Sequence, residues 1–81
     1  MGLTGKWATS GSRMVYEFYE NGLVEMTDSD GTIMARYSEG YNTVTFSISG
    51  HSATNRFESS GRTLRLYPPD GGSPIIFERV Y

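Results

Sequence analysis

The sequence of 81 residues contains no cysteine, and its formal net charge is only −2 at pH 7. Without cysteine, a disulfide framework, thiol chemistry and cysteine-ligated zinc are all excluded. The small negative charge argues against broad nucleic-acid binding, although it leaves room for a local basic patch. Packing must therefore supply the stability, and it can draw on six Tyr, four Phe and one Trp.

The sequence also lacks long apolar runs and any recognisable targeting segment. No apolar stretch is long enough to span a membrane, so no membrane span is expected. Residues 1–4 have neither the basic region nor the apolar stretch of a signal peptide. The compartment stays open: extracytoplasmic if Met1 replaces a trimmed leader, and cytoplasmic otherwise.

What the sequence does contain is a regular series of glycines. They recur about every ten residues, at Gly11, Gly22, Gly31, Gly40, Gly50, Gly61 and Gly71. Short segments rich in Val, Ile, Phe, Tyr and Thr lie between them, a pattern typical of an all-β meander. We expect residues 1–81 to form a single domain with eight strands, at about 5–9, 13–19, 23–28, 32–38, 43–49, 52–58, 62–67 and 75–80.

Side chains alternate between the two faces of a strand, so each turn must keep the apolar face continuous. A three-residue loop over 20–22 with Gly22 left-handed does this in the first hairpin, and places Phe18 opposite Val24 and Tyr16 opposite Met26. For the later hairpins we expect two-residue turns at Asp30-Gly31, Gly50-His51 and Ser60-Gly61. These turns pair Met26 with Ala35, Val24 with Tyr37, Ile48 with Ala53 and Phe57 with Leu64.

The resulting inner face is apolar, with Asn55 as its main polar member. It comprises Trp7, Met14, Tyr16, Phe18, Val24, Met26, Ile33, Ala35, Tyr37, Val44, Phe46, Ile48, Ala53, Phe57, Leu64, Leu66, Ile75 and Phe77. The outer face is mostly polar, and no other part of the chain could cover the apolar one. The sheet should therefore close on itself as an all-β, antiparallel up-and-down barrel of about eight short strands.

Several short motifs resemble those of small bacterial lipocalin-like domains of the calycin type. They are Gly5-Lys6-Trp7 in the first strand, Tyr16-Glu17-Phe18, Asn21-Gly22-Leu23-Val24, Arg62-Thr63-Leu64-Arg65-Leu66, and Phe77-Glu78-Arg79 in the last strand. The resemblance implies that a basic residue of the final strand packs across the tryptophan and closes one end of the barrel. We therefore expect Arg79 to contact Trp7, with a cation–π attraction of roughly 0.5–2 kcal/mol.

The same resemblance implies an interior pocket for a small apolar molecule, and we expect a non-enzymatic binding module with no cofactor. An eight-stranded barrel is just wide enough either to be filled by side chains or to hold one small ligand. If a cavity exists, Tyr16, Tyr37 and Asn55 would orient the ligand, and Phe46 and Phe57 would line it. Their alternative role is hydrogen bonding and packing within a filled core.

Catalysis and metal binding find little support in the sequence. His51 is the only histidine and falls in a predicted turn, and no Gly-x-Ser-x-Gly motif is present, so no enzyme is expected. Glu17 lies opposite Glu25 on the outer face, but two carboxylates make a poor metal site. We expect Arg36 beside Glu25 to compensate their repulsion.

The alternative function is that of a protein-interaction or inhibitor module, which would use an outer apolar patch and the rim loops while the barrel interior is packed. In the expected register Val15 and Met34 flank Thr27, and Tyr19 pairs with Leu23, which would join these four residues into an apolar partner surface. Arg36, Arg56 and Arg65 should align along a belt that includes Thr45 and Ile76. This belt could meet an anionic partner (nucleic acid, carboxylate or an acidic protein), or it could be a solvated face neutralised by Glu58 and Glu78, which we prefer. The oligomeric state would be a monomer or a weak homodimer.

Overall fold

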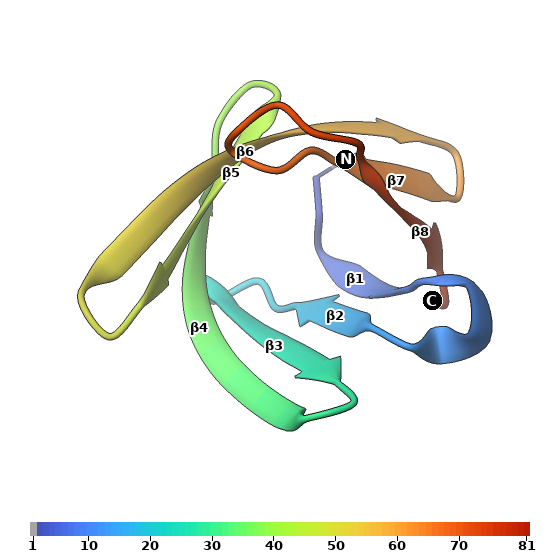
Figure 1. The fold of residues 1–81 in the computed structure, drawn as a ribbon, viewed down its shortest axis with the longest axis horizontal. Coiled ribbons are helices and arrows are strands. Elements are labelled where there is room, and N and C mark those ends of the chain that lie inside the picture. Colours follow the sequence, from blue (N-terminus) through green and yellow to red (C-terminus); the bar gives the residue numbers. More distant parts are fainter. Residues whose placement is uncertain (1) are drawn as a thin grey trace.

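Eight antiparallel strands follow one another in chain order around a closed barrel in the computed structural model, which describes residues 2–81 (Figure 1). The all-β up-and-down barrel predicted from the sequence is thus confirmed. The strands are β1 (Gly5–Ala8), β2 (Val15–Phe18), β3 (Leu23–Asp28), β4 (Gly31–Glu39), β5 (Thr43–Ile48), β6 (His51–Ser60), β7 (Thr63–Leu66) and β8 (Ile75–Arg79); a short 3-10 turn, η1 (Ser10–Ser12), precedes β2. Within residues 2–81, no helix has the length and apolar character needed to cross a membrane.

The hairpin of β2 and β3 has the predicted register. Tyr16 lies opposite Met26 and Phe18 opposite Val24. The Tyr19 N–H donates to the Leu23 carbonyl at 2.8 Å, and Gly22 has a φ of 88°. A three-residue loop with a left-handed glycine therefore connects the two strands, as the apolar pattern requires.

The register between β3 and β4 differs from the prediction by two residues. The turn is centred on Ser29 and Asp30, and Gly31 with a φ of 131° begins β4 instead of occupying the turn. The Asp28 carboxylate accepts a hydrogen bond from the Asp30 N–H at 2.8 Å, which stabilises the turn at this position.

The partners on these two strands change accordingly. Met26 lies opposite Ile33, where Ala35 was expected, and Val24 lies opposite Ala35, where Tyr37 was expected.

Two further turns are displaced by one residue each. Between β5 and β6 the turn centre is Ser49-Gly50, with φ values of 51° and 84°, and Ile48 lies opposite His51 instead of Ala53. Two successive positive φ values suit a tight hairpin because their twist matches that of the strands. Between β6 and β7 the turn centre is Gly61-Arg62 with Gly61 at 60°, so Phe57 lies opposite Leu66 instead of Leu64.

A two-residue shift changes the partner of a side chain but not its face, so most of the predicted inner face is correct. Most of its residues, together with Leu3, form the core. The buried core residues are Leu3, Trp7, Phe18, Val24, Ala35, Val44, Phe46, Phe57, Leu64, Leu66 and Phe77. Met14, Tyr16, Met26 and Tyr37 pack against this core and are partly buried. Leu3 was not predicted; it precedes β1 and is fully buried.

The β3–β4 and β5–β6 hairpins diverge toward their tips, which point in different directions in Figure 1. β4 and β5 pair only between Arg36–Glu39 and Val44–Ser47, so the first part of β4 has no partner on that side. Here the apolar inner face extends beyond the packed core. The consequence is that Ile33, Ile48, Ala53 and Ile75 belong to the inner face by alternation yet are exposed, contrary to the predicted packing.

Candidate functional site

One end of the barrel presents uncovered apolar side chains, and we call it the open end. It is the end at which β2, β4, β6 and β8 begin and β3 and β5 finish. Its inner face carries Ile33, Ile48 and Ile75, which are 51%, 37% and 37% exposed. The partly buried Met14 and Met26 continue this apolar surface down to the core.

Tyr16 forms the floor between the open end and the core. Its ring centroid lies 4.9 Å from that of Phe77 and 6.2 Å from that of Phe46. Its hydroxyl makes no hydrogen bond within residues 2–81, and no buried side-chain oxygen or nitrogen there lacks a partner, so this hydroxyl reaches solvent. Burial, followed by the negative charge of Asp28, raises the pKa of Tyr16 above its ordinary value of 10.0. The hydroxyl, protonated at neutral pH in any case, therefore remains a donor further into the alkaline range.

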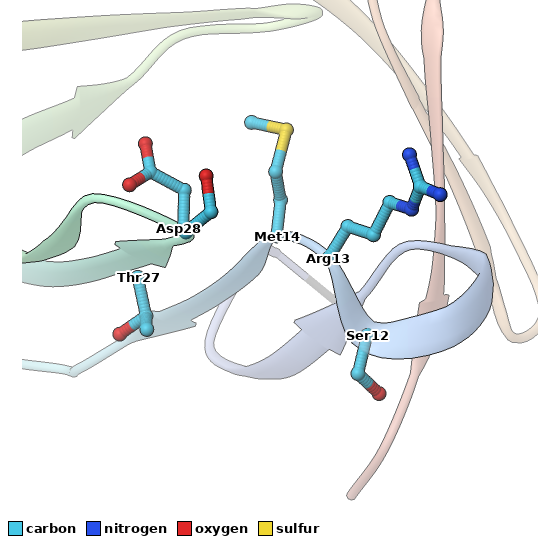
Figure 2. Close-up of a pocket in the computed structure, with 6 residues that line it drawn as sticks. Ser12, Arg13, Met14, Thr27 and Asp28 are labelled. Atoms are coloured by element: carbon cyan, nitrogen blue, oxygen red, sulfur yellow. The ribbon is translucent and has the colours of Figure 1, made fainter.

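Beside this floor, a pocket of about 620 Å³ lies at the rim of the open end (Figure 2). Ser12, Arg13, Met14, Thr27, Asp28 and Ser29 line it. Figure 2 shows that Met14 and Asp28 project to the same side of the strands, while Thr27 and Ser12 project to the other. The rim therefore combines an apolar side chain with one charge of each sign.

The sequence placed Met14 on the inner face but gave no role to Arg13 or Asp28. The correctly predicted pairing of Val15 with Thr27 contained the necessary signal, because it sets the residues before Val15 beside those after Thr27.

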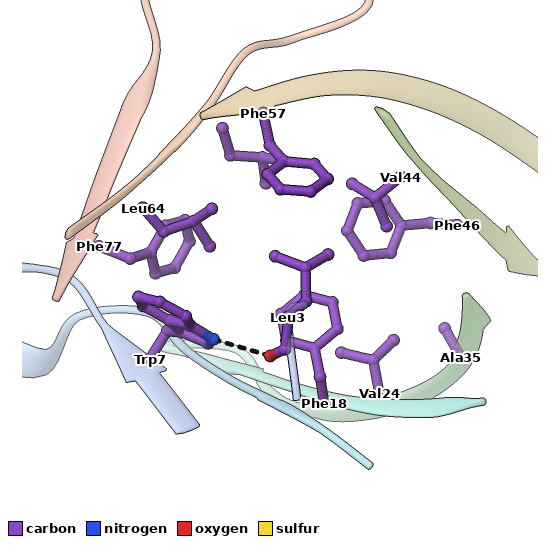
Figure 3. Close-up of a cluster of buried hydrophobic side chains, with 11 residues drawn as sticks. Leu3, Trp7, Phe18, Val24, Ala35, Val44, Phe46, Phe57, Leu64 and Phe77 are labelled. Atoms are coloured by element: carbon purple, nitrogen blue, oxygen red, sulfur yellow. Dashed lines mark hydrogen bonds between the residues drawn. The ribbon is translucent and has the colours of Figure 1, made fainter. Parts of the chain in front are cut away.

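The opposite end is closed by the contact that the sequence predicted between Trp7 and Arg79. The Arg79 guanidinium carbon lies 4.3 Å from the centroid of the Trp7 ring. On the inner side, the Trp7 indole donates a hydrogen bond to the Leu3 carbonyl at 2.9 Å, as the dashed line in Figure 3 shows. The segment before β1 thus lies across the end of the barrel and places Leu3 in the buried core.

Arg79 also joins the two ends of the chain through backbone carbonyls. Its Nη1 atom donates to the Thr4 carbonyl at 3.1 Å and to the Tyr81 carbonyl at 3.3 Å. Only two residue pairs join β1 and β8, Trp7 with Arg79 and Ala8 with Glu78. These side-chain contacts therefore strengthen the shortest seam of the barrel.

Four of the five residues predicted to contact a ligand instead have structural surroundings. Tyr37 donates to the Tyr19 carbonyl at 2.9 Å, and the Asn55 amide donates to the Tyr67 carbonyl at 2.8 Å. Phe46 and Phe57 are buried in the core. Of the five, Tyr16 alone combines an unpartnered polar atom with a position at the open end.

The predicted partner surface is not continuous. Val15 lies opposite Thr27, but Thr27 lies opposite Thr32, and Met34 lies opposite Glu25. The expectation that Val15 and Met34 flank Thr27 is therefore wrong, because the β3–β4 turn shifts the register by two residues.

The other two residues of that surface, Tyr19 and Leu23, are paired through the backbone near the closed end, as expected. The acidic pair of Glu17 and Glu25 separates them from Val15 along the strands.

Glu17 and Glu25 do lie opposite each other, yet Arg36 does not compensate them. Arg36 faces Leu23 on one side and Ser47 on the other. Two tyrosines take its place: the Tyr19 hydroxyl donates to Glu25 at 3.1 Å, and the Tyr81 hydroxyl donates to Glu17. Desolvation, followed by these carboxylates, raises the pKa of Tyr19 to about 12.

The predicted arginine belt is also broken up by the register. Arg56 lies opposite Thr43, whereas Arg65 lies opposite Glu58 and Ile76. Arg36 belongs to neither row.

His51 is an exposed residue at the start of β6 and not in the turn. Residues 2–81 contain no group of three or more His, Cys, Asp or Glu side chains placed to hold a metal ion.

Comparison with known proteins assigns neither a family nor a function to the chain. No protein-family model matches the chain, and neither the curated proteins nor the solved structures yielded a significant match.

Proposed function

We propose that this protein is a non-enzymatic, lipocalin-like binding module that takes a small apolar molecule at the open end of its barrel. The observation that carries this proposal is the difference between the two ends of one apolar face. Near the closed end, Trp7, Phe18 and Phe77 are at most 1% exposed, whereas Ile33 at the open end is 51% exposed. An uncovered apolar surface joined to a packed core favours an apolar occupant.

The ligand must be small and must bind at the open end of the barrel, not at its centre. Eleven buried side chains fill the core, among them Phe46 and Phe57. The ligand would instead contact Met14, Met26, Ile33 and Ile48. Each square ångström of apolar surface removed from water contributes about 25 cal/mol, so a molecule that covers these side chains gains affinity mainly from this contact.

Tyr16 supplies the polar contact that would orient such a molecule. Its hydroxyl reaches solvent at the inner side of the open end, and it is protonated at neutral pH, as tyrosine ordinarily is. A ligand with a hydrogen-bond acceptor at its inner end would gain this interaction, whereas a saturated hydrocarbon would not.

The proposal can be tested with the neutral fluorescent probe N-phenyl-1-naphthylamine. Ile33 and Met34 are consecutive residues of β4 with the same exposed fraction, 51%, but they lie on opposite faces of the sheet. Ile33→Ser should weaken probe binding about tenfold, which corresponds to about 1.4 kcal/mol of lost apolar contact. Met34→Ser is the matched control and should leave the affinity unchanged. Absence of saturable binding, or an equal effect of both substitutions, would overturn the proposal.

A further inference from the structure

A second pocket, of about 280 Å³, lies on the outer side of the barrel between β5, β6 and the segment 67–72. Its lining consists of Thr43, Thr54, Arg56, Tyr67, Pro68, Pro69, Gly71 and Gly72. Thr43 and Thr54 come from the outer faces of β5 and β6, where Thr43 lies opposite Arg56. This pocket shares no lining residue with the rim pocket at the open end.

Arg56 stacks on the ring of Tyr67 at this pocket. Its guanidinium carbon lies 4.8 Å from the centroid of the Tyr67 ring, and the Tyr67 N–H donates to the Arg56 carbonyl at 2.9 Å. Stacking on an aromatic face leaves the edges of the guanidinium group available for hydrogen bonds in its plane. The side chain is therefore positioned to present paired donors.

The carboxylates near Arg56 are engaged elsewhere. Glu58 accepts a hydrogen bond from the Tyr67 hydroxyl at 3.2 Å and lies 3.9 Å from Arg65. Asp70 accepts a hydrogen bond from the Gly72 N–H at 3.0 Å within its own turn. No Asp or Glu of residues 2–81 lies within salt-bridge distance of Arg56, so its positive charge has no protein counter-ion there.

The remaining walls suit an anionic group attached to a small apolar body. Thr43 offers a hydroxyl beside Arg56, while the rings of Pro68, Pro69 and Tyr67 supply apolar contact. Arginine binds carboxylate and phosphate through two parallel hydrogen bonds, which are stronger than neutral ones. From this geometry we propose that the pocket binds an oxyanion, carboxylate or phosphate, of a small molecule, independently of the apolar ligand at the open end.

The experiment is a nitrogen–proton NMR titration of the whole chain with benzoate, phenyl phosphate and the neutral benzyl alcohol. Benzoate or phenyl phosphate should cause saturable shifts at the backbone amides of Thr43, Arg56 and Gly71. The stronger of the two identifies the preferred anion. Benzyl alcohol should bind at least about tenfold more weakly, because it cannot form charge-assisted hydrogen bonds.

Arg56→Gln should weaken anion binding at least about tenfold, since it removes the charge while keeping most of the side-chain volume. The matched control is Arg36→Gln, which removes another exposed outer-face arginine that has no salt bridge within residues 2–81. It should leave the shifts at residues 43, 56 and 71 unchanged. Absence of saturable shifts, an equal loss in both variants, or equal binding of benzyl alcohol would each overturn the proposal.

Discussion

Arg79 lies across the face of Trp7, with its guanidinium carbon 4.3 Å from the ring centroid, and thereby joins the last strand to the first. The two residues are also opposite each other in the backbone register of β1 and β8. Arg79 therefore helps to close the barrel and covers the buried Trp7 ring. Its hydrogen bonds to the carbonyls of Thr4 and Tyr81 also attach the segments before β1 and after β8.

Replacing Trp7 by Ala should lower the free energy of unfolding by about 3–5 kcal/mol. The side chain is fully buried, and its loss also removes the hydrogen bond to the Leu3 carbonyl. Urea unfolding followed by circular dichroism measures the difference. A nearly neutral result would mean that Trp7 does not occupy the closed end.

Arg79→Met should lower the free energy of unfolding by about 1–3 kcal/mol, because it removes the cation–π contact and two hydrogen bonds to carbonyls while retaining an apolar stem. The control is Arg65→Met. Arg65 pairs with Glu58 at 3.9 Å through side chains that are 54% and 58% exposed, so its loss should cost less than about 0.5 kcal/mol. Equal effects of the two substitutions would contradict the closure role of Arg79.

Deprotonation of Tyr19 should lower the free energy of unfolding at strongly alkaline pH. Its pKa rises from 10.0 to about 12 on folding, so the folded state holds the proton more tightly than the unfolded state. This contribution is complete below pH 10 and disappears as the pH rises through about 12. Phenolate absorbance at 295 nm should show a tyrosine that titrates near pH 12 and is absent in Tyr19→Phe.

Glu25→Gln tests the cause of that shift. It should bring the late step closer to 10, although not completely, because desolvation is the largest single cause of the raised pKa and Glu17 also contributes. An unchanged titration curve in Tyr19→Phe would assign the late step to another tyrosine.

The turn between β5 and β6 allows a test with two changes of opposite sign. Ser49 has a φ of 51° and Gly50 a φ of 84°, a conformation for which Asn-Gly is strongly preferred. Ser49→Asn should therefore raise the free energy of unfolding, by about 0.5 kcal/mol. Gly50→Ala should lower it by about 1–2 kcal/mol from backbone strain alone, since a Cβ there meets no atom within 4 Å. Thermal unfolding of both variants measures these changes. A lower unfolding temperature for Ser49→Asn would contradict the turn conformation described for Ser49 and Gly50.

The sequence predicted the barrel and most of its inner face because both depend on a period of two residues. Moving a turn by one residue changes the register by two, which leaves Met26 and Ile33 on the face that alternation gives them. The cross-strand partner of each side chain, in contrast to its face, depends on the exact position of the turn. The Asp28 carboxylate stabilises the turn at Ser29-Asp30, and this hydrogen bond cannot be read from the spacing of glycines.

The candidate site was harder to predict than the fold, because it depends on how far the hairpins diverge. Phe46 and Ile48 share one face of β5, yet Phe46 is buried while Ile48 is 37% exposed. Nothing in their residue types distinguishes these surroundings. Tyr37 and Asn55 were reasonable candidates for the same reason, and only their hydrogen bonds to backbone carbonyls show a structural role.

The most direct test of the binding proposal is to map where an apolar ligand contacts the barrel. Methyl NMR spectra should be recorded while the protein is titrated with N-phenyl-1-naphthylamine. Binding at the open end predicts saturable shifts for the methyl groups of Met14, Met26, Ile33 and Ile48, with none for Val44, Leu64 or the outward Met34. Shifts centred on Met34 or Val15, or no saturable shift anywhere, would contradict binding at the open end.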